Sequence, residues 1–248
     1  MASRSGRNGR YRRRARREDL GLSPADYARL ARLTTPARIQ AFVSAIPANH
    51  ELAGETVHSV RSVLRRREAH CIEAALLAAC ALWIHGEPPL VLHLDCADSD
   101  YPHVIALFRR GRCVGAISKS NGTWLRFREP VYRSVRELAM SYFHEYFDRA
   151  GAKTLRGYSR PFDLRAFDPA CWVTARDSCW PVHDRLAALH HYPLVSAAQA
   201  AALGRRDPFE RAAQRHVQYP PPARRSASQA AAQGDAENPL DRGQNRVF

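Results

Sequence analysis

The chain has 248 residues and a formal net charge of +14, a length that suits one sizeable domain or two small ones. The charge is concentrated at the ends, because residues 1–18 hold eight arginines and one acid, and residues 204–248 hold eight arginines and five acids. Residues 19–203 therefore carry only +4, so the high isoelectric point gives no reason to expect the folded part itself to bind nucleic acid.

The N-terminal residues 1–19 are rich in Arg, Ser and Gly and contain almost no apolar side chains. This composition predicts a disordered arm. One interpretation is a weak contact with nucleic acid or an acidic surface, and the other is a solvated tail without a function of its own. The arm runs into Glu18 and Asp19 with no apolar segment behind it, so we expect no signal peptide.

Two helix starts follow the arm. Ser23 precedes Pro24, and Thr35 precedes Pro36, and in both pairs a capping residue stands before a proline at the first helical position. Apolar residues at helical spacing follow the second start, and Pro47 ends that helix. We then expect a loop over residues 48–58.

The middle of the chain predicts two further helices and an antiparallel sheet. Residues 60–67 form a short helix, and residues 71–85 form the most apolar helical stretch, which Gly86 ends. The stretch is too short to span a bilayer, so we expect no transmembrane segment. Strands are predicted at 88–94, 103–108, 113–117 and 124–128, the second and third joined as a hairpin and the last ended by Glu129-Pro130.

The C-terminal part is less regular. Residues 135–146 predict an amphipathic helix, and residues 161–203 contain several short helical patterns. Residues 204–248 are rich in Pro, Ala, Gln and Arg and predict a mostly disordered tail. The sequence therefore predicts one domain over residues 20–203.

Cysteine usage indicates a reducing compartment. The spacing of the cysteines gives neither a CxxC pair nor a disulfide framework. We therefore expect free thiols and a cytoplasmic protein. The six residues are Cys71, Cys80, Cys96, Cys113, Cys171 and Cys179.

Cys71 and His103 form the most informative pair. Cys71 begins the apolar helix, where the helix dipole and unpaired backbone N–H groups favour a thiolate. His103 begins a strand, and its imidazole could accept the proton of the thiol. The alternative is that Cys71 belongs to the core, as we expect for Cys80, since cysteine is among the most buried residue types.

The order of elements is a helix with Cys71 at its start, a strand, a strand with His103 at its start, and a further strand. Over residues 60–128 this order resembles the transglutaminase-like, papain-related superfamily, and residues 115–121 and 128–132 look like uncharacterised bacterial members of it. The resemblance implies an α+β fold with a central Cys-bearing helix packed on a small antiparallel sheet, and N- and C-terminal helices. It also implies Cys71 as nucleophile and His103 as base and then acid, with neither a cofactor nor a metal.

The residue that orients the histidine is where this chain departs from the resemblance. In the superfamily an acid usually does this from the next strand, and the matching position here is Ser118. Ser118 could face His103 across the hairpin. Asn121 could instead orient it through its side-chain carbonyl. The strand register decides between them.

We therefore predict cysteine-dependent acyl transfer on a peptide or protein substrate, as hydrolysis or transamidation. One alternative is a catalytically inactive fold that serves as a binding or scaffold module, because Ser118 replaces the acid. A second is a nucleic-acid-associated protein acting through residues 1–19. A zinc site has only weak support, because its candidates lack a tight ligand pair; they are His93, Cys96, His103 and Cys113.

Overall fold

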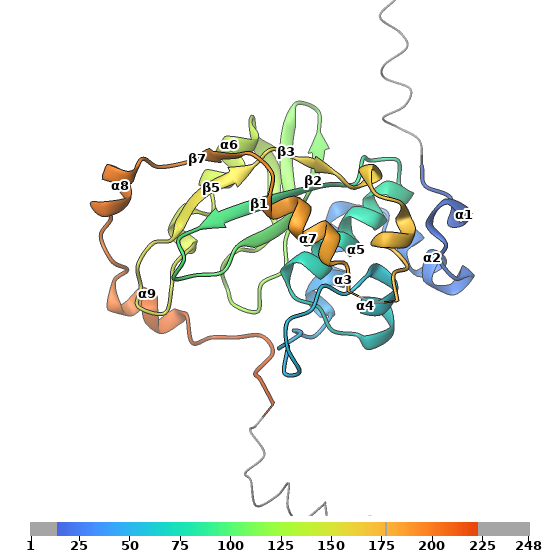
Figure 1. Cartoon of the computed structure of the whole chain (residues 1–248), viewed down its shortest axis with the longest axis horizontal. Helices are drawn as coiled ribbons and strands as arrows, with labels where there is room; N and C mark the ends of the chain where they lie inside the picture. Colours follow the sequence, from blue (N-terminus) through green and yellow to red (C-terminus); the bar gives the residue numbers. More distant parts are fainter. Residues whose placement is uncertain (1–13, 177, 223–248) are drawn as a thin grey trace, which may run out of the picture.

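The computed structural model describes residues 14–176 and 178–222, and the expectations for residues 1–13 and 223–248 lie outside them (Figure 1). The described residues form helices around one antiparallel sheet of seven strands. The predicted α+β class is confirmed.

Five helices precede the sheet: α1 (Arg17–Leu20), α2 (Pro24–Ala31), α3 (Pro36–Ala45), α4 (Val60–Arg66) and α5 (Cys71–Ile84). The two predicted capping residues are in place. Ser23 Oγ accepts a hydrogen bond from the N–H of Asp26 at 3.1 Å, and Thr35 Oγ1 accepts one from the N–H of Arg38 at 3.2 Å. Each bond satisfies a backbone N–H that has no partner within its helix.

The folded part begins earlier than the predicted residue 20. Ala15 is buried, its N–H donates to the carbonyl of Trp83 at 3.1 Å, and its own carbonyl accepts from the Tyr27 hydroxyl at 3.2 Å. Trp83 lies in the last turn of α5, where helix carbonyls lack intrahelical partners. The end of the Arg-rich segment therefore caps the central helix.

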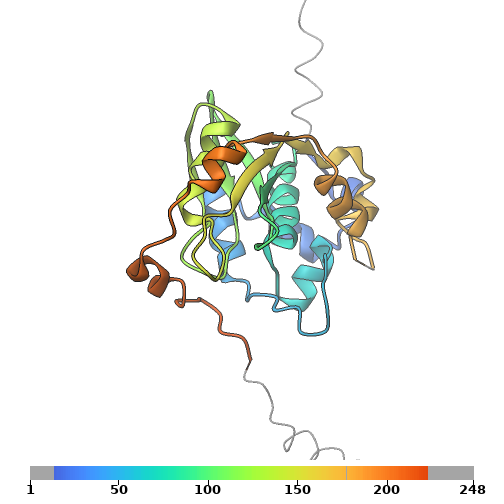
Figure 2. The ribbon, with the colours of Figure 1, turned by 60° about the vertical axis from the view of Figure 1, so that its left-hand side comes forward.

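Helix α5 is the centre of the fold (Figure 2). It packs against β1 and β2 on one side and against α2, α3 and α4 on others. Almost every residue after Cys71 is buried, as expected for a helix that is apolar all round. This burial fixes the position of the helix, and thereby of the residue at its start.

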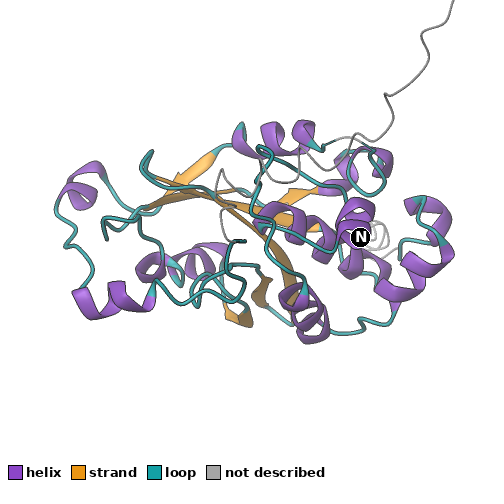
Figure 3. Ribbon diagram, turned by 90° about the horizontal axis from the view of Figure 1, so that it is seen from below, coloured by secondary structure: helices purple, strands orange, loops and turns teal. Residues whose placement is uncertain are grey.

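The sheet has the order β4-β3-β2-β1-β5-β7, with β6 also paired to β1. Successive side chains along each strand point to opposite faces of the sheet. Val91 and Ala106 belong to the core around α5, whereas Leu92 and Ile105 belong to a second core on the other face. Helices cover both faces (Figure 3). The strands are β1 (Leu90–Cys96), β2 (His103–Arg110), β3 (Cys113–Ile117), β4 (Arg128–Tyr132), β5 (Leu155–Ser159), β6 (Phe162–Asp163) and β7 (His191–Pro193).

The predicted strand at 124–128 is wrong, because β4 starts at Arg128 and contains Pro130. The sheet order puts β4 at an edge, where it pairs only with β3. An edge strand tolerates a proline because one side of its backbone needs no ladder partner. Proline was therefore misread as the end of a strand.

The remaining elements follow β4: α6 (Val135–Met140), the 3-10 helices η3 (Phe143–Glu145), η4 (Leu164–Ala166) and η5 (Pro169–Cys171), and the helices α7 (Trp180–Ala187), α8 (Ala197–Ala201) and α9 (Pro208–Ala213). The single helix predicted over 135–146 is thus divided into α6 and η3. At the division, Arg128 donates to the carbonyl of Ser141 at 3.1 Å. An arginine that binds the last carbonyls stabilises a helix end.

The described part of the tail is also more structured than predicted. Residues 204–222 include α9 and an antiparallel bridge between Gly122 and Val217. The segment after α9 runs back beneath the sheet towards α3 (Figure 1).

Candidate functional site

Cys71 is the first residue of α5, and the residue as a whole is half-buried. The amides of this first turn have no acceptors within the helix, and they favour negative charge. Burial raises the pKa of the thiol, but hydrogen bonding and electrostatic attraction to His103 and His70 outweigh burial and hold that pKa well below its usual range. The thiol is therefore set up to lose its proton.

His103 begins β2 and is buried, and Ser118 fixes its orientation. The Nε2 atom of His103 lies 2.8 Å from Ser118 Oγ, and the Ser118 hydroxyl itself donates to the carbonyl of Leu125 at 2.5 Å. Because that hydroxyl proton is already engaged, Ser118 accepts from His103, and Nε2 carries the imidazole proton. The Nδ1 atom then has a free lone pair with which to accept a proton.

The strand register explains why Ser118 meets His103. Ala106 pairs with Ile117, so in the same register Ile105 stands opposite Ser118 and His103 is its diagonal neighbour. Gln40 holds the backbone of Ser118 on both sides, because its Oε1 accepts from the N–H at 2.9 Å and its Nε2 donates to the carbonyl at 2.8 Å. The predicted contact between His103 and Ser118 is present.

The Asn121 side chain is hydrogen-bonded to Tyr219 and not to His103. Its Nδ2 donates to the carbonyl of Tyr219 at 2.8 Å, and its Oδ1 accepts from the N–H of the same residue at 2.9 Å. Asn121 still lines the cavity that contains Cys71. Of the two candidates for orienting the histidine, Ser118 alone has the required geometry.

A second imidazole lies beside the thiol, and the sequence did not identify it as part of the site. The Nδ1 atom of His70 is 3.9 Å from Cys71 Sγ, and its Nε2 lies 2.8 Å from the carbonyl of Thr56. Burial lowers the pKa of His70, but hydrogen bonds to Cys71 and Glu73 overcome this effect and raise it to about 11. His70 therefore brings a positive charge to the thiolate.

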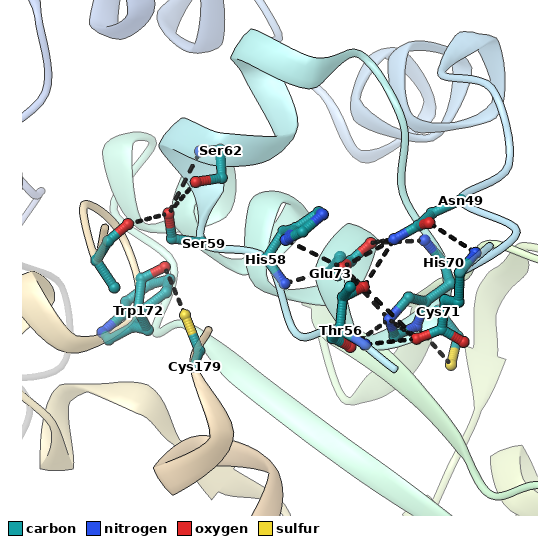
Figure 4. Close-up of polar contacts among 12 residues, drawn as sticks. Asn49, Thr56, His58, Ser59, Ser62, His70, Cys71, Glu73, Trp172 and Cys179 are labelled. Atoms are coloured by element: carbon teal, nitrogen blue, oxygen red, sulfur yellow. Dashed lines mark hydrogen bonds and ion pairs between the residues drawn. The ribbon is translucent and has the colours of Figure 1, made fainter. Parts of the chain in front are cut away.

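Glu73 anchors this second imidazole (Figure 4). Its fully buried carboxylate accepts from the N–H of His70 at 2.9 Å, the N–H of His58 at 2.8 Å and the hydroxyl of Thr56 at 2.8 Å, and Asn49 Nδ2 lies 3.2 Å from it. Burial raises its pKa, but the His70 imidazole and the backbone N–H groups of His58 and His70 lower it to about 2. An acid three residues after the cap is a capping-box signal, by which sequence reasoning could have found Glu73.

The thiol lies between two cavities. One of about 390 Å³ is lined by Cys71, His103, Lys119 and Trp124, and the other, of about 480 Å³, by Cys71, Glu51 and Trp180 among others. Tyr101 and Pro102 line both cavities. An elongated substrate could therefore extend from the thiol in two directions.

The loop that carries Tyr101 is tied down. The Tyr146 hydroxyl donates to the carbonyl of Tyr101 at 2.5 Å, and the Thr154 hydroxyl donates to Asp100 at 2.5 Å. The side chain of Tyr101 is nonetheless one of the most exposed large apolar groups among the described residues. The loop is thus fixed by its backbone and offers an aromatic ring at the rim of both cavities.

The four zinc candidates are not brought together. His93 Nδ1 lies 2.9 Å from His191 Nε2, and Cys113 pairs with Arg110 at the far end of the hairpin from His103. Burial raises the pKa of Cys96 to about 12. Within residues 14–176 and 178–222, no three His, Cys, Asp or Glu side chains are grouped as metal ligands.

Comparison with known proteins adds no assignment. No protein-family model matches the chain, and a search of curated proteins finds no match. In the part of the chain that the structure describes, no helix has both the length and the apolar character needed to cross a membrane.

Proposed function

We propose that this protein is a cysteine-dependent acyl-transfer enzyme that acts on peptide or amide bonds. The observation that carries the proposal is the Cys71 thiol at the start of α5, with a lowered pKa, beside a histidine that Ser118 orients. The order of the elements supports membership in the transglutaminase-like, papain-related superfamily. Six free cysteines among the described residues support a reducing, cytoplasmic location.

The reaction follows from the groups at the site. His103 Nδ1 takes the thiol proton, and the Cys71 thiolate attacks the substrate carbonyl carbon. Backbone N–H groups at the start of α5 can stabilise the oxyanion. When the carbon–nitrogen bond breaks, His103 returns the proton to the leaving amine, and the acyl group stays on sulfur. Water or a second amine then releases it, which gives hydrolysis or transamidation.

Two residues, Ser118 and His70, replace the single acid of the superfamily: Ser118 orients His103, and His70 stabilises the charge of the ion pair. A serine hydroxyl fixes the tautomer of His103 but brings no negative charge to stabilise an imidazolium. His70 instead stabilises the thiolate directly, since it lies 3.9 Å from the sulfur and Glu73 holds it in place. The pair of imidazoles supports an ion-pair mechanism without an acid next to His103.

A binding or scaffold module is the second candidate, because Ser118 stands where the superfamily usually has an acid. In that case the site would bind a peptide without turning it over. Contact of the Arg-rich residues 1–19 with nucleic acid or an acidic surface stays a separate prediction, which the salt dependence of binding by a chain that lacks residues 1–13 would test.

The test is acylation by p-nitrophenyl acetate. We expect a burst of one equivalent of p-nitrophenolate, an acetyl group on Cys71 in the peptide mass map, and slow turnover afterwards. Cys71→Ala should abolish the burst, whereas Cys171→Ala, which removes an exposed thiol, should retain it. A wild-type protein that shows neither burst nor acetylated Cys71 would contradict the enzyme and favour the scaffold.

A further inference from the structure

A short segment that lies beyond α9 pairs with the residues that follow Ser118. It consists of Val217, Gln218 and Tyr219, and we call it the C-terminal strap. Gly122 and Val217 form an antiparallel bridge. The N–H of Gln218 donates to the carbonyl of Asn121 at 2.8 Å. The strap is therefore held by an isolated antiparallel bridge, a main-chain contact of the kind with which many domains bind extended peptides.

The side chain of Asn121 hydrogen-bonds the main chain of the strap. Its amide binds both the N–H and the carbonyl of Tyr219, at 2.9 and 2.8 Å. These groups are the same in every peptide bond except those that contribute a proline nitrogen. The site that holds Tyr219 can therefore accept the main chain of other extended peptides.

The strap is attached by polar contacts more than by apolar burial. Gln218 is exposed and Tyr219 only half-buried. The Tyr219 hydroxyl donates to the carbonyl of Ser44 at 2.8 Å, and Lys119 Nζ lies 5.3 Å from the centre of its ring. Little apolar surface holds the segment, so we expect its attachment to be reversible.

The edge that binds the strap is also a wall of the cavity at the thiol. Lys119, Ser120 and Asn121 line the cavity that contains Cys71, and they directly follow Ser118. A Cβ atom on Gly122 would lie 2.3 Å from the ring of Trp124, another lining residue. One short segment thus connects the oriented histidine, the cavity wall and the strap.

We propose that residues 119–122 form a binding edge for the extended main chain of a peptide substrate, and that the C-terminal strap occupies this edge in cis. The proposal rests on the proposed function, since it assigns a peptide substrate to that site. An aromatic side chain at the position of Tyr219 would gain the contact with Lys119. The tethered strap competes at a high effective concentration, so it lowers the rate at which peptides reach the thiol.

The first test compares two electrophiles on the full-length chain. Gln218→Pro removes the N–H that binds Asn121, and Gln218→Ala, the matched control, keeps it. Both substitutions remove the side-chain hydrogen bonds of Gln218 with Arg126 and Ser44. Relative to Gln218→Ala, we expect Gln218→Pro to raise the rate of Cys71 alkylation by an extended peptidyl chloromethyl ketone about fivefold, the value of one hydrogen bond. The rate with iodoacetamide, which is too small to need the edge, should not change. Gln218→Ala should have the smaller effect.

Two results would overturn the proposal. Unchanged rates with both reagents would mean that the strap does not cover a peptide site. A parallel fall in both rates would mean that the strap only braces the cavity wall.

A second measurement keeps the edge testable if Cys71 reacts with neither reagent, which would refute the proposed function alone. A synthetic peptide spanning residues 214–222 should bind the Gln218→Pro variant saturably in calorimetry. It should bind the Gln218→Pro, Asn121→Ala double variant at least fivefold more weakly. Equal binding to both variants, or none to either, would contradict the peptide edge.

Discussion

Cys71 and Cys80 lie on the same helix, and their thiols have opposite properties. Cys71, at the start of α5, has the imidazoles of His103 and His70 as polar partners, and both lower its pKa. Cys80, in the middle of the helix, is fully buried, and burial raises its pKa. One helix therefore provides a reactive thiol at its end and a packing side chain along its length.

The comparison teaches that position on a helix matters more than residue type. The first turn offers unpaired N–H groups and room for polar partners, whereas the interior of a buried helix offers neither. Around Cys71 these partners are imidazoles that are themselves fixed, by Ser118 and by Glu73. Substitutions at His103, Glu73 and Ser118 therefore remove the partner or one of its supports, one at a time.

Loss of His103 should have the largest effect. In His103→Ala the thiol loses its proton acceptor, so the rate of acylation by p-nitrophenyl acetate at neutral pH should fall by about 10² to 10⁴-fold. Stopped-flow measurement of the burst tests this. His190→Ala, at an exposed histidine, should retain the wild-type rate. Equal rates in wild type and His103→Ala would remove His103 from the mechanism.

Glu73→Gln should weaken the fold in a pH-dependent way. The folded-state pKa of Glu73 is about 2 against an ordinary 4.5, so its carboxylate stabilises the fold above about pH 4.5 and this contribution is lost as the pH falls towards 2. Near neutral pH the variant should lose about 3 kcal/mol of unfolding free energy.

Urea denaturation across this pH range tests the prediction for Glu73. Wild type and Glu73→Gln should differ most near neutral pH and converge near pH 2. Glu87→Gln, at a surface carboxylate paired with Arg110, should change the unfolding free energy by less than about 1 kcal/mol. A difference between wild type and Glu73→Gln that does not depend on pH would contradict the buried ionised carboxylate.

Ser118→Ala should have a smaller effect on the reaction. Without the hydroxyl, His103 keeps its place but loses the partner that fixes its tautomer, so we expect acylation to slow by about five- to tenfold. The Cys71 pKa, read from the pH dependence of the burst, should move upward. Ser196→Ala, which removes a hydroxyl at the start of α8, should change neither. An unaltered pH profile in Ser118→Ala would mean that Ser118 serves packing alone.

Local patterns in the sequence predicted much of the frame. Alternation and turn residues identify the hairpin of β2 and β3, and capping residues identify the starts of α2 and α3. The pairing of Cys71 with His103 followed from the order of elements. The hairpin and the helix starts depend on neighbours in the chain, which a sequence displays directly, whereas the pairing of Cys71 with His103 rests on a resemblance.

Contacts between distant residues were not predictable in the same way. The choice between Ser118 and Asn121 depends on strand register and on Tyr219, which is 98 residues from Asn121 in the chain. Pro130 was misread because its tolerance depends on β4 being an edge strand. The strands β6 and β7, of two and three residues, are too short to show a period.

The measurement that tests the central claim most directly is the pH dependence of iodoacetamide labelling at Cys71 and Cys80 in the same folded protein, followed by peptide mass mapping. The account predicts half-maximal labelling of Cys71 well below about pH 8.5, which is the ordinary pKa of a free cysteine thiol. Cys80 should stay unlabelled until the protein unfolds. A Cys71 that labels only at or above pH 8.5, or that stays as protected as Cys80, would contradict it.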